Sequence, residues 1–244
     1  MAGSYHKDER RGVIKDSMMG LDGKVVIIAG GRGGLGQTVT PTFANAGARV
    51  IVIDRHATGQ PQAREIGIGA DVTDESSVAS AVRQVLDQEG RLDCLVNLVG
   101  SFAPGRLADT SPATWNTMLS LNVTAAYLLS RAVIPHLSTQ GNGRIVHIAA
   151  RAAQDPFPGA AAYIVAKSGL MALIRVLALE LAGSGVTING VLPTTIDTPA
   201  NRQTMPKADP SKWVKPEAIA DLLLFLASDE AVSINGALIP LGTP

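Results

Sequence analysis

The chain has 244 residues, of which 46% are hydrophobic, enough to bury a full core and to favour a single domain. Its 21 basic and 21 acidic side chains balance, which argues against a nucleic acid or an anionic membrane as partner. The one cysteine, Cys94, excludes an intrachain disulfide, and the histidines lack metal-ligand spacing. We therefore predict a cytoplasmic protein without a metal site.

Residues 1–20 are polar and mixed in charge, so we expect a flexible extension there, followed by one domain at 21–244. From Lys24 onward, short β-branched segments alternate with longer helical patterns, which is typical of βαβ units. The predicted strands are 24–29, 48–54, 65–72, 92–100, 143–149, 186–193 and 236–241. The predicted helices are 34–46, 74–89, 112–138, 160–182 and 216–228. This order predicts an α/β fold, a doubly wound Rossmann domain whose seven-stranded parallel sheet has helices on both faces.

A glycine-rich segment, AGGRGGLG at 29–36, follows the first predicted strand and opens the first helix. In this context it is typical of a dinucleotide site, because backbone N–H groups at a helix N-terminus bind pyrophosphate. We expect Gly30 to make the tight turn and Gly34 to let the backbone approach the pyrophosphate. Gly36 is expected to let helix and strand touch, with Leu35 packed beneath.

Acidic residues follow the second and third predicted strands. Asp54 lies 18 residues beyond Gly36, where a carboxylate accepts hydrogen bonds from both adenosine ribose hydroxyls. Since this charge repels a 2′-phosphate, we expect NAD(H) to be preferred, while Arg32 and Arg55 nearby leave NADP(H) possible. Asp71 and Val72 are expected to contact the adenine, and a helix-capping role is the alternative for Asp71.

The predicted helices 112–138 and 160–182 carry few charges and are apolar nearly all round. A helix that covers a sheet normally keeps one polar face, so a second apolar face indicates a partner surface. We expect a homodimer or homotetramer formed through these two helices. The alternative is that loops of the same chain cover them.

The segment YIVAK places Tyr163 and Lys167 on one face of a helix. Together with the glycine loop and the strand order, it resembles the short-chain dehydrogenase/reductase family over residues 22–242. The resemblance implies an NAD(P)-dependent oxidoreductase in which Tyr163 donates or accepts the proton. It also implies that the Lys167 ammonium lowers the pKa of Tyr163 and that Lys167 holds the nicotinamide ribose.

Other positions match the family's pattern. Asn122 is similar to its helix asparagine, which implies support for a water relay to Lys167. Asn97 and Gly100 stand where the family has its N-N-A-G turn, although Leu98 and Val99 replace the middle pair. The resemblance implies that Asn97 stabilises the sheet near the cofactor, and an ordinary asparagine at a strand end is the alternative. Pro193 and Thr198 are implied at the cofactor, Thr198 through a hydrogen bond to the nicotinamide carboxamide.

One position departs from the family's pattern, because Ala150 stands where the catalytic serine is usual, thirteen residues before Tyr163. Deleting such a hydroxyl donor commonly costs about 2.7 to 4 kcal/mol of transition-state stabilisation. The dihydropteridine reductase branch is similar in having alanine here, and segments 150–163 and 192–213 look like that branch. The resemblance implies hydride transfer to a conjugated acceptor such as quinonoid dihydropterin, with Tyr163 as proton donor.

A proline-punctuated segment at about 194–215 is expected to form a substrate lid. Two alternatives stay open for the function: a carbonyl or alcohol oxidoreductase of the broader family, in which Arg151 or water replaces the serine, and a catalytically retired NAD-binding scaffold. Phe157, Met205 and Trp213 either pack on a flat substrate or form the core of the lid. The positions expected to face the substrate are Ala150, Arg151, Phe157, Met205 and Trp213.

Overall fold

The computed structural model describes residues 20–56 and 64–242, so the expected extension lies, apart from Gly20, outside the described residues. Seven parallel strands form one sheet in the order β3-β2-β1-β4-β5-β6-β7. This confirms the predicted doubly wound fold. The strands are β1 (Val25–Ala29), β2 (Arg49–Asp54), β3 (Glu65–Gly69), β4 (Cys94–Asn97), β5 (Gly143–Ile148), β6 (Val186–Pro193) and β7 (Leu238–Leu241).

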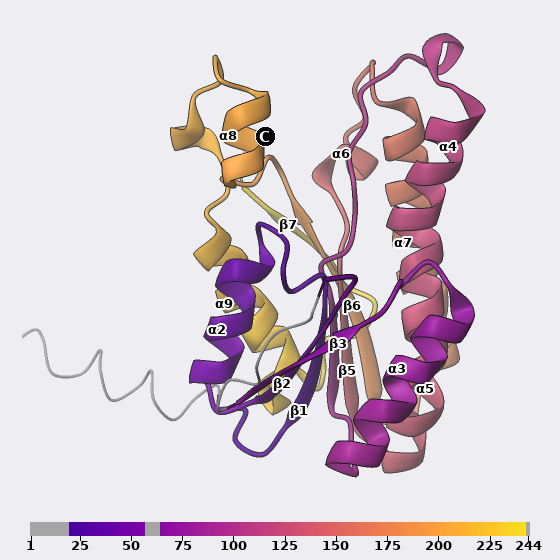
Figure 1. Ribbon diagram of the computed structural model, residues 1–244, viewed down its shortest axis with the longest axis vertical. Helices are drawn as coiled ribbons and strands as arrows, with labels where there is room; N and C mark the ends of the chain where they lie inside the picture. Colours follow the sequence, from indigo (N-terminus) through magenta and orange to yellow (C-terminus); the bar gives the residue numbers. More distant parts are fainter. Residues whose placement is uncertain (1–19, 57–63, 243–244) are drawn as a thin grey trace, which may run out of the picture.

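Helices cover both faces of the sheet (Figure 1). One face is covered by α2 (Gly36–Asn45) and α9 (Pro216–Ala227). The other is covered by α3 (Glu75–Glu89), α5 (Ala125–Gln140) and α7 (Ala161–Glu180). Three shorter helices, α4 (Pro112–Leu119), α6 (Arg151–Gln154) and α8 (Pro199–Thr204), lie toward the end of the molecule where β6 leads into α8 (Figure 1).

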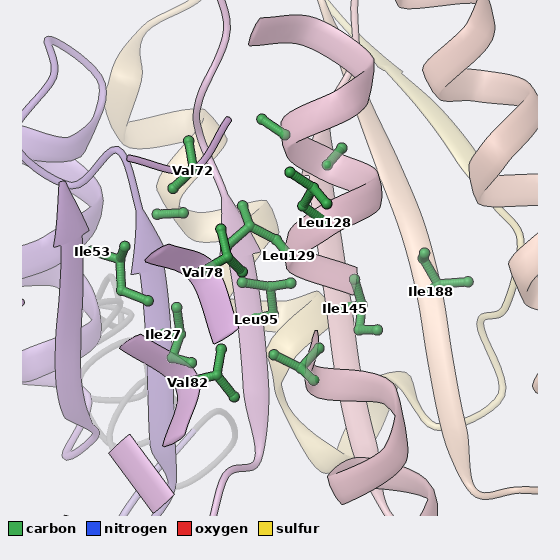
Figure 2. Close-up of a cluster of buried hydrophobic side chains, with 14 of the residues drawn as sticks. Ile27, Ile53, Val72, Val78, Val82, Leu95, Leu128, Leu129, Ile145 and Ile188 are labelled. Atoms are coloured by element: carbon green, nitrogen blue, oxygen red, sulfur yellow. The ribbon is translucent and has the colours of Figure 1, made fainter. Parts of the chain in front are cut away.

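The larger core lies between the sheet and α3, α5 and α7. Figure 2 shows side chains of α3 and α5 facing the strands. The strands are apolar on both faces, because each face must be buried under helices. The labelled residues of this core are Ile27, Ile53, Val72, Val78, Val82, Leu95, Leu128, Leu129, Ile145 and Ile188.

The register of the central strands brings their carboxyl ends together. Ala29 pairs with Asn97, and Asn97 pairs with His147. The glycine loop, the turn after β4 and the segment after β5 therefore leave the sheet side by side. In open α/β sheets this is the edge at which ligands bind.

Two strand ends and one cap differ from expectation. β3 ends at Gly69, before Asp71, whose carboxylate accepts hydrogen bonds from the backbone N (2.9 Å) and hydroxyl (2.6 Å) of Thr73 and so turns the chain. The capping role considered for Asp71 belongs to Asp74, which accepts from Ser77 N at 2.7 Å. β4 ends at Asn97, because the chain turns after this residue, where Val99 N donates to Asn97 Oδ1 at 3.0 Å.

The helical stretches Pro112–Gln140 and Ala161–Glu180 are long and apolar enough to cross a membrane by length and composition. This is weak evidence for a membrane span, because helices that cover the core of a soluble protein meet the same criterion. In the structure both stretches pack against the sheet and contribute side chains to the larger core. The first contains a π-helical turn at Ser120–Thr124, which includes Asn122.

Candidate active site

The glycine loop fits a dinucleotide pyrophosphate. Gly30 has a φ of 79°, which favours glycine, and its backbone N donates to Ile53 O at 2.9 Å. A Cβ on Gly36 would lie 2.4 Å from the backbone of Gly31, so helix and loop touch as expected. Leu35 is buried beneath them. Gly33, Gly34 and Gly36 have no side chain, so an anion can approach the backbone N–H groups at the start of α2.

The adenosine end of the predicted cofactor site lies at the carboxyl ends of β2 and β3. Asp54 ends β2, and its Oδ1 accepts from His56 N at 3.2 Å. Hydrogen bonds from Thr73, and then the charge of Arg55, hold the pKa of Asp71 below its usual range. Val72 is buried in the larger core. The adenine contact of Asp71 and Val72 stays a prediction.

Lys167 is the centre of a cluster that it forms with Ile148, Gly100 and Asn122. Its side chain is buried, and its Nζ donates to the carbonyl oxygen of Ile148, the last residue of β5, at 2.7 Å. Burial lowers its pKa to about 8. A Cβ on Gly100 would lie 3.0 Å from Lys167 Nζ and 2.9 Å from Asn122 Oδ1. Gly100 thus gives both side chains the room that they occupy.

Asn122 holds the turn after β4. Its Nδ2 donates to Ser101 O at 2.9 Å and to Met118 O at 3.0 Å, while its Oδ1 accepts from Ser101 N at 3.2 Å. The π-helical turn places this side chain there, and such turns are frequent at functional sites. The structure thus assigns Asn122 a clamping contact with Ser101, and the water relay stays a prediction.

Tyr163 lies one helical turn before Lys167 on α7. The prediction that its pKa is lowered was wrong. Burial raises the pKa of Tyr163 to about 12, whereas the resemblance implied a lowered value. The physical reason is that desolvation dominates while the Lys167 ammonium donates to Ile148 O. The Tyr163 ring also makes an edge contact with Phe102, with ring centroids 5.0 Å apart.

A buried polar chain supports the turn after β4. Asn97 Nδ2 lies 3.1 Å from His147 Nδ1, and Ser130 Oγ lies 3.0 Å from His147 Nε2. Burial and then the charge of Lys167 lower the pKa of His147 to about 3, so the ring is neutral. The Asn97 amide donates to Nδ1, which leaves the Nε2 proton for Ser130. Asn97 is thereby fixed with its oxygen toward Val99 N.

The segment after β5 offers no hydroxyl. Ala150 is buried at the start of α6, and no serine or threonine occurs between it and Tyr163. Arg151, the alternative donor, forms an ion pair with Asp155. The guanidinium is thus already engaged in the structure, which weakens it as a replacement for the serine.

The predicted lid is anchored at both ends by Asp197. This carboxylate accepts from Arg202 Nε at 2.6 Å and Nη2 at 3.0 Å, and from Lys215 Nζ at 2.6 Å. These hydrogen bonds hold its pKa far below the usual range. Thr198 caps α8 and lies against the glycine loop, where a Cβ on Gly34 would be 3.4 Å from its Cβ. The lid therefore begins beside the predicted cofactor site.

The expected substrate residues divide by exposure. Phe157 and Met205 are exposed, which argues against a role in the core of the lid, whereas Trp213 is half-buried. Pro193 is the buried last residue of β6. Sequence reasoning missed Phe102, which is 55% exposed beside Tyr163. The signal was available, because this aromatic residue follows Gly100 by two positions.

The family model described as Enoyl-(Acyl carrier protein) reductase matches residues 29–241. The chain is 34% identical over 235 residues to the (2S)-[(R)-hydroxy(phenyl)methyl]succinyl-CoA dehydrogenase subunit BbsD of Thauera aromatica, covering 89% of this chain and 94% of that one. It is 30% identical over 239 residues to the 3-oxoacyl-[acyl-carrier-protein] reductase FabG of Thermotoga maritima, covering 91% and 97%. A solved 3-ketoacyl-(acyl-carrier-protein) reductase from Brucella melitensis, complexed with NADH, matches with a TM-score of 0.82 and 27% identity over 91% of this chain and 98% of that one.

With this fold, the glycine loop and the Tyr163–Lys167 pair, the chain belongs to the short-chain dehydrogenase/reductase family. It is an NAD(P)-dependent oxidoreductase, as its similar relatives, which include dehydrogenases and reductases, indicate.

We predict that Gly100→Ala impairs the reaction while leaving the fold intact. The added methyl would displace the ends of Lys167 and Asn122, which are flexible side chains. Misplacing groups at a reacting centre by about 1 Å can cost about 10²-fold in rate, so we expect kcat/KM to fall about tenfold or more. Overpacking should lower the free energy of unfolding by only about 1–3 kcal/mol. Steady-state kinetics and thermal unfolding measure the two effects. The matched control is Gly20→Ala, whose Cβ would meet its nearest atom at 3.8 Å. Equal kcat/KM in both variants would contradict the assignment.

We predict that Lys167→Met abolishes turnover yet stabilises the protein near pH 7. The pKa of Lys167 is about 8 in the fold, against 10.5 for an exposed lysine, so the buried ammonium costs on the order of 3 kcal/mol below pH 8. Between these values the unfolded chain binds more protons, so wild-type stability rises with pH. The advantage of the variant, about 1–3 kcal/mol after loss of the Ile148 hydrogen bond, should shrink toward about pH 10. Urea unfolding of the wild type and the variant near pH 7 and near pH 10 tests this. A difference in unfolding free energy that is the same at both pH values would refute the prediction.

Proposed function

We propose that the protein is an NADH-dependent reductase that delivers hydride to a conjugated acceptor such as quinonoid dihydropterin. The observation that carries the proposal is a retained Tyr163 and Lys167 beside a buried Ala150 in place of the usual serine. The resemblance of segments 150–163 and 192–213 to the dihydropteridine reductase branch supports the same acceptor. Exposed Phe102, Phe157 and Met205 offer apolar surface for a flat ring.

In this proposal each residue of the site has a separate role in the reaction. Bound NADH supplies the hydride. Tyr163 donates its Oη proton to a ring nitrogen of the acceptor and later regains a proton from water. Its pKa of about 12 keeps it protonated at neutral pH, which is the form that a proton donor needs. Lys167 and the turn held by Asn122 position the nicotinamide ribose.

The missing hydroxyl fits this acceptor. A simple ketone develops negative charge on one oxygen in the transition state, and the usual serine donates a hydrogen bond to it. A quinonoid dihydropterin is a conjugated imine system, so the electrons of the hydride spread over the ring. Proton donation from Tyr163 then matters more than a second donor, and an alanine at position 150 is tolerated.

Three observations support a preference for NADH over NADPH. Asp54 places a carboxylate where a 2′-phosphate would lie. The positive charge of Arg55 helps to lower the pKa of the Asp71 carboxyl. Arg32 forms an ion pair with Glu65. Both nearby cations are thus already near acidic partners.

A second candidate function is a carbonyl or alcohol oxidoreductase. It is favoured by similar relatives such as the D-threitol dehydrogenase of Mycolicibacterium smegmatis, which is 32% identical over 235 residues, covering 89% of this chain and 90% of that one. In this case water, or Arg151 after release from Asp155, would have to replace the serine. A catalytically retired scaffold is the third, and the retained pair of Tyr163 and Lys167 argues against it.

We predict rapid NADH oxidation by the purified protein with freshly generated quinonoid dihydropterin. NADPH should support a lower kcat/KM, because its 2′-phosphate meets the carboxylate of Asp54. Tyr163→Phe should lower kcat by about 10²–10⁴, because the proton donor is lost. Stopped-flow absorbance of NADH or NADPH measures kcat and kcat/KM in each case.

The control is Ala150→Ser, assayed on the pterin and on a panel of ketones and diols. A large gain on simple ketones, with none on the pterin, would favour the second candidate function. Binding of NADH without oxidation by any acceptor would leave the retired scaffold.

We also propose a cytoplasmic homodimer or homotetramer. Exposed apolar side chains on α5 and α7 support the expected partner surface: Tyr127, Val165, Val176 and Leu179. Within the described residues these positions remain exposed, which argues against loops as their cover. A second copy of the same helices is the simplest partner.

We predict that sedimentation velocity finds at least two chains per particle and that Leu179→Lys shifts the protein toward monomer. The side chain of Leu179 is 79% exposed, so its replacement should disturb an interface and not the core. Val232→Lys is the matched control, because Val232 is exposed but lies outside α5 and α7. A monomeric wild type would refute the proposal.

A further inference from the structure

An ion pair joins the glycine loop to the edge strand of the sheet. Arg32 Nη2 lies 2.5 Å from Glu65 Oε1, and the Glu65 side chain is 10% exposed. Glu65 Oε1 is buried and has no well-aligned hydrogen bond in the described structure. The charge of Arg32 is therefore what compensates this buried carboxylate.

The register of β2 and β3 shows in which direction the contact with Glu65 holds the Arg32 guanidinium. Arg32 lies in the turn closed by Gly33 N donating to Gly30 O at 3.0 Å, beside the end of β2. On β3, Gly69 pairs with Asp54, but Glu65 pairs with Val50, near the opposite end of the strand. Four residues of strand span about 13 Å. The side chain of Arg32 thus points down the sheet, away from the carboxyl end where Asp54 lies.

We propose that Glu65 is a specificity-determining residue that holds Arg32 and so disfavours a dinucleotide with a 2′-phosphate. The inference rests on the proposed preference for NADH and adds a second device to the repulsion from Asp54. It gives a role to a carboxylate that lies outside the glycine loop and the predicted acidic positions.

Glu65 and a 2′-phosphate would compete for the positive charge of Arg32. An arginine in the glycine loop is well suited to bind phosphate through charge-assisted hydrogen bonds. To do so, Arg32 would have to leave Glu65 buried without its counter-charge, which is unfavourable. NADH makes no such demand, because its ribose offers hydroxyls in place of the phosphate. The ion pair therefore penalises NADPH selectively.

The test is the dissociation constants of NADH and NADPH for the full chain, measured by fluorescence titration without any acceptor. Glu65→Gln keeps the shape of the side chain and removes the charge that holds Arg32. We expect NADPH to bind about tenfold or more tightly relative to NADH than in wild type. The double variant Glu65→Gln with Arg32→Gln should lose this gain, because Glu65 acts through Arg32.

Glu89→Gln is the matched control. Glu89 pairs with Arg49 at 3.0 Å, is 16% exposed, and lies at the end of α3 away from the glycine loop. Removing its charge should leave the ratio of the two constants unchanged. Should Glu65→Gln fail to fold, Glu65→Asp shortens the reach of the carboxylate and should shift the ratio in the same direction.

An unchanged ratio in a folded Glu65 variant would overturn the inference, as would an equal shift in the Glu89 variant or in the double variant. Wild-type protein that binds NADPH as tightly as NADH would instead refute the proposed preference. The ratio between variants would still test the contact between Glu65 and Arg32. The two failures are therefore distinguishable.

Discussion

The ammonium group of Lys167 is buried, and its hydrogen bond to the carbonyl oxygen of Ile148 ties α7 to the end of β5. A charge in this position restricts its neighbours. Residue 100 must lack a side chain, and the turn that contains it is held by the amide of Asn122. The central strands, the turn after β4 and α7 are thereby fixed relative to one another. The stability lost to the buried charge is the cost of that arrangement.

The fold was predictable because its signals are local. Apolar runs of strand length, helical periodicity and the glycine-rich turn each occupy one segment, and their alternation is sufficient to define a doubly wound sheet. The strand ends were less accurate. The expected strands at 65–72 and 92–100 stop earlier, since Asp71 and Asn97 turn the backbone with their own side chains. Such local hydrogen bonds are common for these residue types, yet the pattern of hydrophobic residues does not reveal them.

The electrostatics of the site were not predictable, because they join residues that are distant in sequence. Glu65 lies 33 positions from Arg32, and His147 lies 50 positions from Asn97. The high pKa of Tyr163 likewise depends on how deeply α7 is buried, which spacing does not give. Spacing did identify Tyr163 and Lys167 as a pair, but not that the ammonium would donate to the backbone.

Asp197 binds Arg202 and Lys215, so one carboxylate secures both ends of the segment that carries α8. A loop whose ends are fixed can change its inner residues without disturbing the sheet from which it leaves. Relatives that are about one third identical to this chain bear names for quite different substrates, including a succinyl-CoA derivative and a sugar alcohol. Fixed loop ends of this kind would let evolution replace the inner residues of this segment while the sheet and the glycine loop are inherited intact.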